Sequence, residues 1–238
     1  MKLITIYNNE EILKAGLLAS HKQFLNNTDI IGVNNCDGQF ESFADAMASI
    51  LTQLPKDEPI IITHQDVQFY ENDTYNLLKK YLPSNNLSIF LYGLVGVNKF
   101  TLKAEEAGVN PIICAGKQIN YRPITKPTSV ESIDECVIIT NRNTIENCNL
   151  FMDKRLKWHL YAVDACLQMQ RSEQEVYVIP VPINHLSSGK FDREYICLSL
   201  YLLNKYNRRH IYTTNLHISR TNILIAYFKT LVKDFSCL

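Results

Sequence analysis

Residues 59–66 read PIIITHQD, an Ile-rich apolar run that passes directly into a polar loop. Two earlier segments have the same form: residues 3–7 (LITIY) lead into Asn8-Asn9, and residues 29–33 (DIIGV) lead into residues 34–38 (NNCDG). Short β-rich apolar runs that end at such polar residues are typical of buried strands. Because stretches with helical spacing separate the three runs, the sequence predicts parallel βαβ units and therefore a doubly wound α/β sheet.

The apolar spacing between these strands indicates two helices. In the first, Leu13, Leu17 and Phe24 share one face. The second is predicted to begin at Ser42, with Asp45 three residues further on in the pattern of a capping box. Its apolar stripe consists of Phe43, Met47, Ile50 and Leu54.

The rest of the chain has a less regular pattern. Strands are predicted at residues 88–97, 112–122, 135–140 and 176–181, and helices at residues 155–170 and 191–206. The buried stripe of the helix at 155–170 holds Leu156, Leu160, Val163 and Leu167. A last, amphipathic helix is predicted at residues 218–235, with Leu224, Phe228, Leu231 and Phe235 on one face. We therefore expect one domain at residues 1–210 and a C-terminal helical extension at residues 211–238.

The composition is that of an ordinary globular protein, with 46% hydrophobic and 20% charged residues. The 24 Lys and Arg residues balance the 24 Asp and Glu residues, so no net field attracts nucleic acid. The seven cysteines are scattered and never spaced as CxxC, a pattern that favours a reducing cytoplasm over a disulfide framework or a zinc ribbon. No apolar run approaches the roughly 20 residues of a membrane span, and polar residues from Asn8 onward interrupt any signal-peptide core. We expect a cytoplasmic protein.

The polar loops after the first three strands should meet at one edge of the sheet. They are Tyr7-Asn8, Asn34 to Asp37, and His64 to Asp66. Doubly wound sheets bind ligands at the carboxyl ends of their strands, although strand-end loops are commonly polar for other reasons. The chain has no GxGxxG, GxxxxGK[ST] or GxSxG motif, so a dinucleotide dehydrogenase, a P-loop protein and the usual hydrolase elbow are disfavoured. A metal that bridges a diphosphate to a carboxylate is the obvious alternative way to hold a nucleotide.

Asp66 is the carboxylate best placed to bind such a metal, because it directly follows an Ile-rich strand. His64 precedes it by two residues and could share its face, although Asp66 could equally cap a turn. His185 lies in the loop PINHLSSGK (residues 182–190), where Lys190 could contact a phosphate. Asp164 lies beside the buried stripe of an aromatic-rich helix, where it could be a general base with a raised pKa or a solvated helix residue.

Five motifs in this order resemble small GT-A glycosyltransferases of the family-2-like group typified by a streptomycin-biosynthesis protein. The resemblance extends from about residue 2 to residue 206. Its motifs are HQDV at residues 64–67, YGLVGV at 92–97, FMD at 151–153, HLYAVDACL at 159–167 and HLSSG at 185–189.

The resemblance implies a GT-A fold: a doubly wound, mostly parallel sheet with flanking helices. It also implies a nucleoside-diphosphate-sugar donor and a divalent metal, Mn²⁺ or Mg²⁺. Asp66 falls in the metal-binding place of the DxD signature, with His64 at the first acidic position, and His185 falls at a C-terminal metal or diphosphate ligand. The loops at Tyr7-Asn8 and at Asn34 to Asp37 would hold the base and ribose.

The resemblance leaves the identity of the catalytic base open. Related inverting enzymes carry an acidic pair in the helix that contains Asp164, and Ala162 stands at one of the acidic positions. Asp164 would deprotonate the acceptor hydroxyl if the enzyme inverts, and Lys190 together with the metal would stabilise the departing diphosphate. Whether the reaction inverts or retains configuration stays undecided at this point.

The sequence thus predicts a metal-dependent glycosyltransferase that moves a sugar from a donor such as a UDP-sugar to a hydroxyl group of a glycan, a lipid-linked acceptor or a metabolite. The alternatives are a nucleotidyltransferase and a non-catalytic GT-A-like protein that binds a sugar nucleotide or a partner. Arg208, Arg209 and Arg220 near the last helix are compatible with a membrane surface. Packing of that helix on the domain, or on a second copy in a homodimer, is the other interpretation.

Overall fold

In the computed structural model, residues 1–24, 28–56, 58–70, 74–83, 88–98, 107–188, 192–215 and 217–225 are described. Lys190, predicted to contact the diphosphate, lies outside these residues. So do Phe228, Leu231 and Phe235 of the predicted C-terminal helix.

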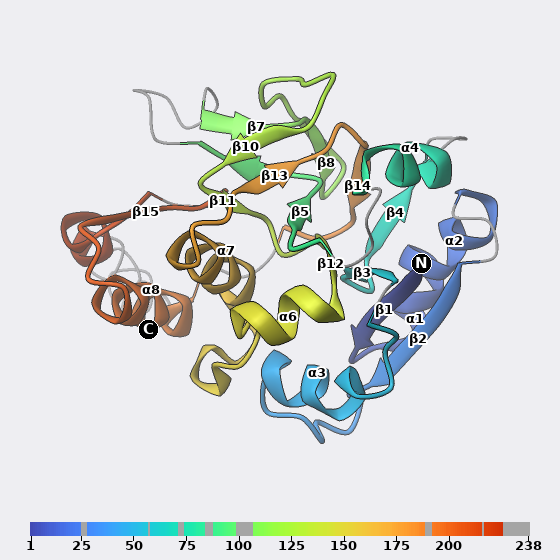
Figure 1. The fold of residues 1–238 in the computed structure, drawn as a ribbon, viewed down its shortest axis with the longest axis horizontal. Coiled ribbons are helices and arrows are strands. Elements are labelled where there is room, and N and C mark those ends of the chain that lie inside the picture. The colour runs from blue at the N-terminus through green and yellow to red at the C-terminus, as the bar shows by residue number, and fades with distance from the viewer. Residues whose placement is uncertain are drawn as a thin grey trace, which may run out of the picture.

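A seven-stranded sheet forms the centre of the protein, with the strand order β10-β13-β5-β12-β3-β1-β2 (Figure 1). Strand β1 pairs in parallel with β2 and β3, and β5 pairs in parallel with β13. Strand β12 runs antiparallel to both of its neighbours, and β10 is antiparallel to β13. Five strands therefore point the same way, which confirms the predicted mostly parallel sheet. The strands are β1 (Lys2–Tyr7), β2 (Asp29–Asn34), β3 (Pro59–Thr63), β5 (Leu91–Gly93), β10 (Thr128–Val130), β12 (Val137–Asn141) and β13 (Val176–Val178).

Helices cover both faces of this sheet. Successive strand residues point to opposite sides, so Ile60 and Ile62 pack into one hydrophobic cluster and Ile61 into another. The first cluster includes residues of α3 (Phe43–Leu51), α6 (Arg142–Cys148) and α7 (Tyr161–Arg171). The second includes residues of α1 (Glu10–Leu13), the π-helical turn η1 (Lys14–Leu18) and α4 (Thr74–Tyr81). Helix α2 (Ala19–Phe24) follows η1 without a break. The strands are continuous apolar runs because both of their faces are buried.

The two predicted helices of the N-terminal half are present. Asn9 caps α1, and its side chain accepts hydrogen bonds from the backbone N–H groups of Glu11 and Ile12. Ser42 caps α3 as predicted: its hydroxyl accepts from the Asp45 N–H at 3.1 Å and donates to the Asp45 carboxylate at 2.7 Å. The predicted apolar stripe of α3, from Phe43 to Leu54, is buried.

Smaller sheets flank the central one. A four-stranded sheet has the order β4-β14-β8-β9, and a three-stranded sheet has the order β11-β6-β7. The predicted strand at 88–97 is therefore divided between two sheets, because the chain turns at Leu94-Val95. The strands are β4 (Val67–Phe69), β6 (Gly96–Val97), β7 (Gly108–Val109), β8 (Ile112–Cys114), β9 (Lys117–Ile119), β11 (Ser132–Ile133) and β14 (Ile183–His185).

The helix predicted at residues 155–170 is shorter than expected. A 3-10 turn, η2 (Lys154–Leu156), is followed by a break, and α7 begins only at Tyr161. Lys157 and Leu160 have positive φ angles of 48° and 59°, which an α-helix does not allow. The predicted stripe from Leu156 to Leu167 is nevertheless buried, packed against α8 (Arg193–Lys205), which matches the helix predicted at 191–206.

The C-terminal segment begins with a hairpin rather than a helix. Strands β15 (His210–Tyr212) and β16 (His217–Ser219) pair antiparallel, and residues 220–225 are helical. Ile223 is buried, whereas Leu224, predicted on the apolar face, is 58% exposed. Among the described residues, no helix is long and apolar enough to cross a membrane.

Candidate functional site

His64, Asp66 and His185 form a cluster of metal-ligand type at one edge of the central sheet. One ligand atom from each side chain lies within 4.8 Å of the others. His185 Nε2 is 3.2 Å from Asp66 Oδ1 and 3.4 Å from His64 Nδ1. Asp66 and His185 are each only 9% exposed. The structure therefore brings together all three residues predicted to hold the metal.

The local fold explains why residues 64–66 and residue 185 meet. Strand β3 ends at Thr63, and the following loop leads directly into β4. Strand β4 pairs antiparallel with β14, which places His185 opposite Val67, and the Leu186 N–H donates to the Asp66 carbonyl at 3.0 Å. The three side chains are thus supported by backbone pairing, the kind of rigid support that a metal site requires.

Gly16 supports the same loop from the opposite side. The Leu17 N–H in η1 donates to the Gln65 carbonyl at 3.0 Å, so the helical turn lies directly against the loop. A Cβ atom on Gly16 would lie 2.7 Å from the Asp66 Cα, closer than side chains approach backbone atoms. Glycine is required at this position because the helix and the loop touch. π-helical turns such as η1 are frequent at functional sites.

Gln65 joins this loop to the end of β1. Its Oε1 atom accepts from the N–H groups of Asn8 and Asn9, both at 3.1 Å, and its Nε2 atom donates to Asn8 Oδ1 at 2.7 Å. The third loop is joined as well, because the Asn35 N–H donates to the Tyr7 carbonyl at 2.7 Å, so all three strand-end loops predicted to converge are in contact.

The charges in the cluster are coupled. Burial acts to raise the pKa of Asp66, but the hydrogen bond and positive charge of His185 outweigh it and hold this pKa well below its ordinary value. Burial acts to lower the pKa of His185, and the contact with Asp66 more than offsets it, so that pKa is raised. Burial and the neighbouring His185 lower the pKa of His64. The cluster thus contains a carboxylate held in its ionised form and a His64 imidazole whose pKa is lowered, and His185 would have to release its proton before it could bind a divalent cation.

Tyr161 orients the imidazole of His64. The Tyr161 hydroxyl lies 2.8 Å from His64 Nε2, which leaves Nδ1 facing His185. A ring nitrogen held in this way fixes the side chain for coordination through the other nitrogen. One carboxylate oxygen and two imidazole nitrogens fit Mn²⁺ better than Mg²⁺, which prefers oxygen ligands throughout.

A cavity of about 280 Å³ opens beside this cluster at the carboxyl ends of β1 and β3. Tyr7 and Asn8, which the resemblance assigned to the base and ribose, both line it. Asn34 and Asp37 are not among its described lining residues, and Asn35 lies there instead. Three aromatic side chains that the sequence did not assign to the site complete the wall: Phe43, Trp158 and Tyr161. The rings of Phe43 and Tyr161 stack at a centroid distance of 3.8 Å.

The local structure of the loop after β2 accounts for this difference. Asn35 is buried, and its amide exchanges hydrogen bonds with the backbone of Phe40. Asn34 is exposed and accepts from the Cys36 N–H, while Asp37 is also exposed. Because successive side chains point to opposite sides, Asn35 faces the cavity and Asn34 points away from the core. The sequence pattern therefore placed the cavity-facing asparagine one residue too early.

A second cavity, of about 190 Å³, lies on the other side of His64 and is also lined by His185, Asp134 and Glu135. Burial and the adjacent Asp134 charge raise the pKa of Glu135 to about 8, against the opposing effect of the backbone N–H groups of residues 160–162. Its Oε1 atom has no hydrogen-bond partner among the described residues. A cavity-lining carboxyl with so perturbed a pKa is a candidate for proton transfer. Sequence analysis missed it, although Glu135 is a charged residue at the first position of the strand predicted at residues 135–140.

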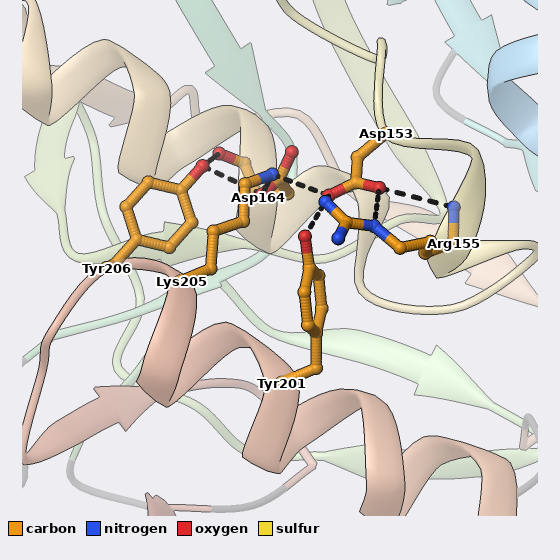
Figure 2. Close-up of polar contacts among 6 residues, drawn as sticks. All are labelled: Asp153, Arg155, Asp164, Tyr201, Lys205 and Tyr206. Atoms are coloured by element: carbon orange, nitrogen blue, oxygen red, sulfur yellow. Dashed lines mark hydrogen bonds and ion pairs between the residues drawn. The ribbon is translucent and has the colours of Figure 1, made fainter.

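Asp164 has different surroundings from those expected of a base. Its carboxylate accepts from Lys205 Nζ at 2.5 Å and from the Tyr206 hydroxyl at 2.7 Å (Figure 2). Lys205 also contacts Asp153, which accepts from the Tyr201 hydroxyl at 2.6 Å. This network ties α7 to the end of α8.

Asp164 is not among the described residues that line either cavity next to His64. Burial raises its pKa, opposed by Lys205. A catalytic role for Asp164 stays a prediction, and its contacts indicate a structural role.

Comparison with known proteins bears on the fold. No protein-family model and no curated protein sequence is detectably similar to the chain. Among solved structures, the chain is similar to GalNAc-T7 with UDP, GalNAc and Mn²⁺, with a TM-score of 0.58 over 85% of this chain at 10% identity. The chain has a GT-A-like fold. It spans about half of that protein, since the match covers 47% of it.

A second solved structure, A197 from STIV, is 12% identical to this chain. The match covers 92% of this chain and 94% of A197. Its TM-score of 0.42 is too low to indicate a shared fold. The evidence for fold therefore comes from the sheet topology and from the similarity to GalNAc-T7.

Proposed function

We propose that the protein is a metal-dependent glycosyltransferase that uses a nucleoside-diphosphate-sugar donor. The observation that carries this proposal is the cluster of His64, Asp66 and His185 at the ligand-binding edge of a GT-A-like sheet. The structure of GalNAc-T7, which has a similar fold, contains UDP, GalNAc and Mn²⁺. His64 and Asp66 line one cavity, and His64 and His185 line another, so a donor in either cavity would lie beside the cluster.

The donor nucleotide would occupy the cavity at the ends of β1 and β3. The ring of Trp158 offers a face for a base, and the amide group of Asn8 offers hydrogen bonds to a base or ribose. The diphosphate would then lie against His64 and Asp66. Lys190, from the predicted phosphate-binding loop, is a further proposed contact.

In the reaction, the acceptor hydroxyl oxygen bonds to the anomeric carbon of the donor sugar, and the bond between that carbon and the diphosphate oxygen breaks. The nucleoside diphosphate leaves, and the acceptor proton passes to a base. A divalent metal held by His64, Asp66 and His185 would supply positive charge that stabilises the departing diphosphate. Two carboxyl groups are candidates for the base: Asp164, which the sequence favours, and Glu135, which lines the cavity next to His64 and His185.

The protein is proposed to act in the cytoplasm. The described cysteines at positions 36, 114, 136, 148, 166 and 197 are all free thiols, as a reducing compartment maintains them. A domain limit near residue 210, and a contact of the C-terminal segment with a membrane surface or a second copy, are further proposals from the sequence.

A thermal-shift screen of nucleoside diphosphates and nucleotide sugars, with Mn²⁺ and with a chelator, tests this function. Selective binding to the folded protein raises its melting temperature, so a stabilising nucleotide should act with Mn²⁺ and lose its effect with the chelator. The matching nucleotide sugar should then be hydrolysed slowly, with release of nucleoside diphosphate. Conversion of the nucleotide sugar and added pyrophosphate to a nucleoside triphosphate and a sugar 1-phosphate would identify a nucleotidyltransferase, binding without turnover would identify a non-catalytic protein, and no stabilisation would contradict nucleotide binding.

A further inference from the structure

The exposed sides of two helical segments lie together at the C-terminal end of α8. Leu200 and Asn204, four residues apart on α8, are both exposed and therefore share one side of that helix. The helical turn at residues 220–225 lies beside this side, because the Arg220 guanidinium donates to Asn204 Oδ1 at 2.9 Å. Leu224 follows Arg220 by four residues and lies on the same side of its turn. The two helical segments thus contribute to one outer surface.

Aliphatic side chains are exposed on this surface. Leu224 is 58% exposed, Ile225 is 50% exposed and Leu200 is 37% exposed. The preceding residue, Ile223, is buried in one hydrophobic cluster with residues of α8, so the turn is fixed with Leu224 and Ile225 outward. Moving such side chains from water into an apolar environment is favourable. The exposed aliphatic groups would therefore gain from contact with an apolar partner.

Three exposed arginines lie next to these side chains. His210 pairs with Ser219 in the β15–β16 hairpin, so the residues just outside this pair, Arg209 and Arg220, lie at the same end of the hairpin. Arg208 directly precedes Arg209, close to the end of α8. Arg220 also begins the helical turn that carries the exposed aliphatic side chains. Positive charge and exposed apolar groups are therefore neighbours.

The charges of these arginines are not neutralised within the protein. Arg220 donates to the amide oxygen of Asn204, and Arg208 donates to the amide oxygen of Gln170 at 3.1 Å, and both acceptors are neutral. Among the described residues, no carboxylate forms an ion pair with Arg208, Arg209 or Arg220. An anionic partner can therefore bind these guanidinium groups without first breaking an ion pair. We call the following six residues the C-terminal face: Leu200, Arg208, Arg209, Arg220, Leu224 and Ile225.

An anionic bilayer surface matches both components of this face. Headgroup phosphates are anions that guanidinium groups bind well, and the boundary of the acyl chains accepts aliphatic side chains. A nucleic acid would bind the arginines and leave Leu224 and Ile225 in water. A second copy of the chain, related by a twofold axis through this face, would bring the same arginines together and be opposed by their repulsion. Charge and exposed apolar surface together therefore favour a membrane.

We propose that the C-terminal face docks the protein on bilayers that contain anionic lipids. The three arginines bind headgroup phosphates, and the three aliphatic side chains enter the boundary between headgroups and acyl chains. Docking of this kind needs neither a nucleotide nor a metal ion. It therefore goes beyond the proposed transferase function and does not depend on it.

Co-sedimentation of the full chain with phosphatidylglycerol vesicles or phosphatidylcholine vesicles, in the presence of a chelator, tests this proposal. The wild type should bind phosphatidylglycerol vesicles, less tightly as the salt concentration rises, and should bind phosphatidylcholine vesicles far more weakly. The double variant with Arg209→Gln and Arg220→Gln should bind phosphatidylglycerol about 25-fold more weakly, since each arginine near an anionic surface contributes about fivefold. Its melting temperature shows whether it is folded.

Two comparison variants separate a specific face from general attraction. Lys79→Gln with Lys80→Gln removes the same number of charges from exposed positions on α4, at the opposite end of the molecule (Figure 1), and should bind as wild type does. Leu224→Gln keeps every charge and should weaken binding about tenfold, because it removes an aliphatic group from the docking face.

A wild type that binds neither kind of vesicle, or binds both equally, overturns the proposal. So does an equal loss of binding in the α4 variant, or full binding by Leu224→Gln, since charge alone would then explain the attraction. A wild type that ignores vesicles but forms a dimer in light scattering, or binds an oligonucleotide, assigns the face to that partner instead. Mn²⁺-dependent binding of UDP, measured on the same samples without vesicles, reports on the proposed function alone, so that function and the docking face can fail separately.

Discussion

Replacement of Gly16 by alanine should damage the metal-ligand cluster although Gly16 does not belong to it. Alanine normally stabilises a helix relative to glycine, by about 1 kcal/mol. Here the added Cβ would lie 2.7 Å from the Asp66 Cα and closer still to the Gln65 carbonyl. Because both atoms belong to the backbone, the loop must move as a unit rather than turn a side chain aside.

The size of the effect follows from this geometry. An ordinary Cβ contact begins near 3.4 Å, so the Asp66 backbone must move by roughly 0.7 Å. Metal–ligand distances tolerate only about 0.2 Å. A displaced Asp66 would lose its alignment with His185, and we expect Gly16→Ala to weaken Mn²⁺ binding by about 10–100-fold, as removal of groups that support metal ligands does.

Calorimetric titration of Mn²⁺ into wild type, Gly16→Ala and Ala15→Gly provides the measurement. Ala15 is the exposed neighbour of Gly16, and Ala15→Gly changes helix propensity without approaching the loop, so it should bind Mn²⁺ as wild type does. Unfolding in urea shows whether Gly16→Ala remains folded. A folded Gly16→Ala protein with the Mn²⁺ affinity of the wild type would refute the claim that this contact positions Asp66.

Three further substitutions test other parts of the structure. Burial raises the pKa of Glu135 from 4.5 to about 8, so the wild type should lose stability as the pH rises between these values. Measured by urea unfolding, the free energy of unfolding of Glu135→Gln should therefore gain up to about 5 kcal/mol relative to wild type from pH 4.5 to pH 8. A difference between the two proteins that does not change with pH would contradict the raised pKa. Asp164→Asn should lower the free energy of unfolding by about 1–3 kcal/mol because it weakens the hydrogen bonds from Lys205 and Tyr206 while Lys205 keeps its pair with Asp153, whereas unchanged stability with transfer reduced on the order of 10²–10⁴-fold would identify Asp164 as the base. Ser42→Ala should cost about 1 kcal/mol through loss of the α3 cap, and an unchanged melting temperature would argue against that cap.

The N-terminal half of the fold was predictable because its signals are local. Each parallel strand is a short apolar run ended by polar residues, and Ser42 marks the start of its helix through a hydrogen bond three residues away. The carboxyl ends of β1 and β3 then had to share an edge, and Gln65 contacts Asn8 there. Local pattern and sheet topology together were sufficient to place Asp66.

The second half depended on contacts between distant segments. His185 lies beside Asp66 because β14 pairs with β4 more than 100 residues earlier, and the sequence alone only placed it after a strand. The positive φ angle of Leu160 delays the start of α7, which the apolar spacing could not reveal because the same residues are buried in either conformation.

Burial also decided which acidic residues matter, and burial is not visible in a single sequence. Asp164 was a candidate base because it lies on an aromatic-rich helix. In the structure its carboxylate instead accepts hydrogen bonds from Lys205 and Tyr206 at the end of α8. Glu135 was an acidic residue at the first position of a predicted strand, yet its side chain lines a cavity and its pKa is strongly raised. Residues 211–219 were expected in a helical extension but belong to the β15–β16 hairpin.

The most direct test of the central claim is calorimetric titration of UDP into wild type and Asp66→Asn, each with Mn²⁺ and with a chelator. Asp66 supplies the only carboxylate of the three-residue cluster, so the wild type should bind UDP tightly only with Mn²⁺ and Asp66→Asn should lose that dependence while remaining folded. His185→Ala should weaken binding less, because water can replace one neutral ligand. Affinity for UDP that ignores the chelator in the wild type, or that is unchanged in Asp66→Asn, would contradict the assignment of His64, Asp66 and His185 as a metal site.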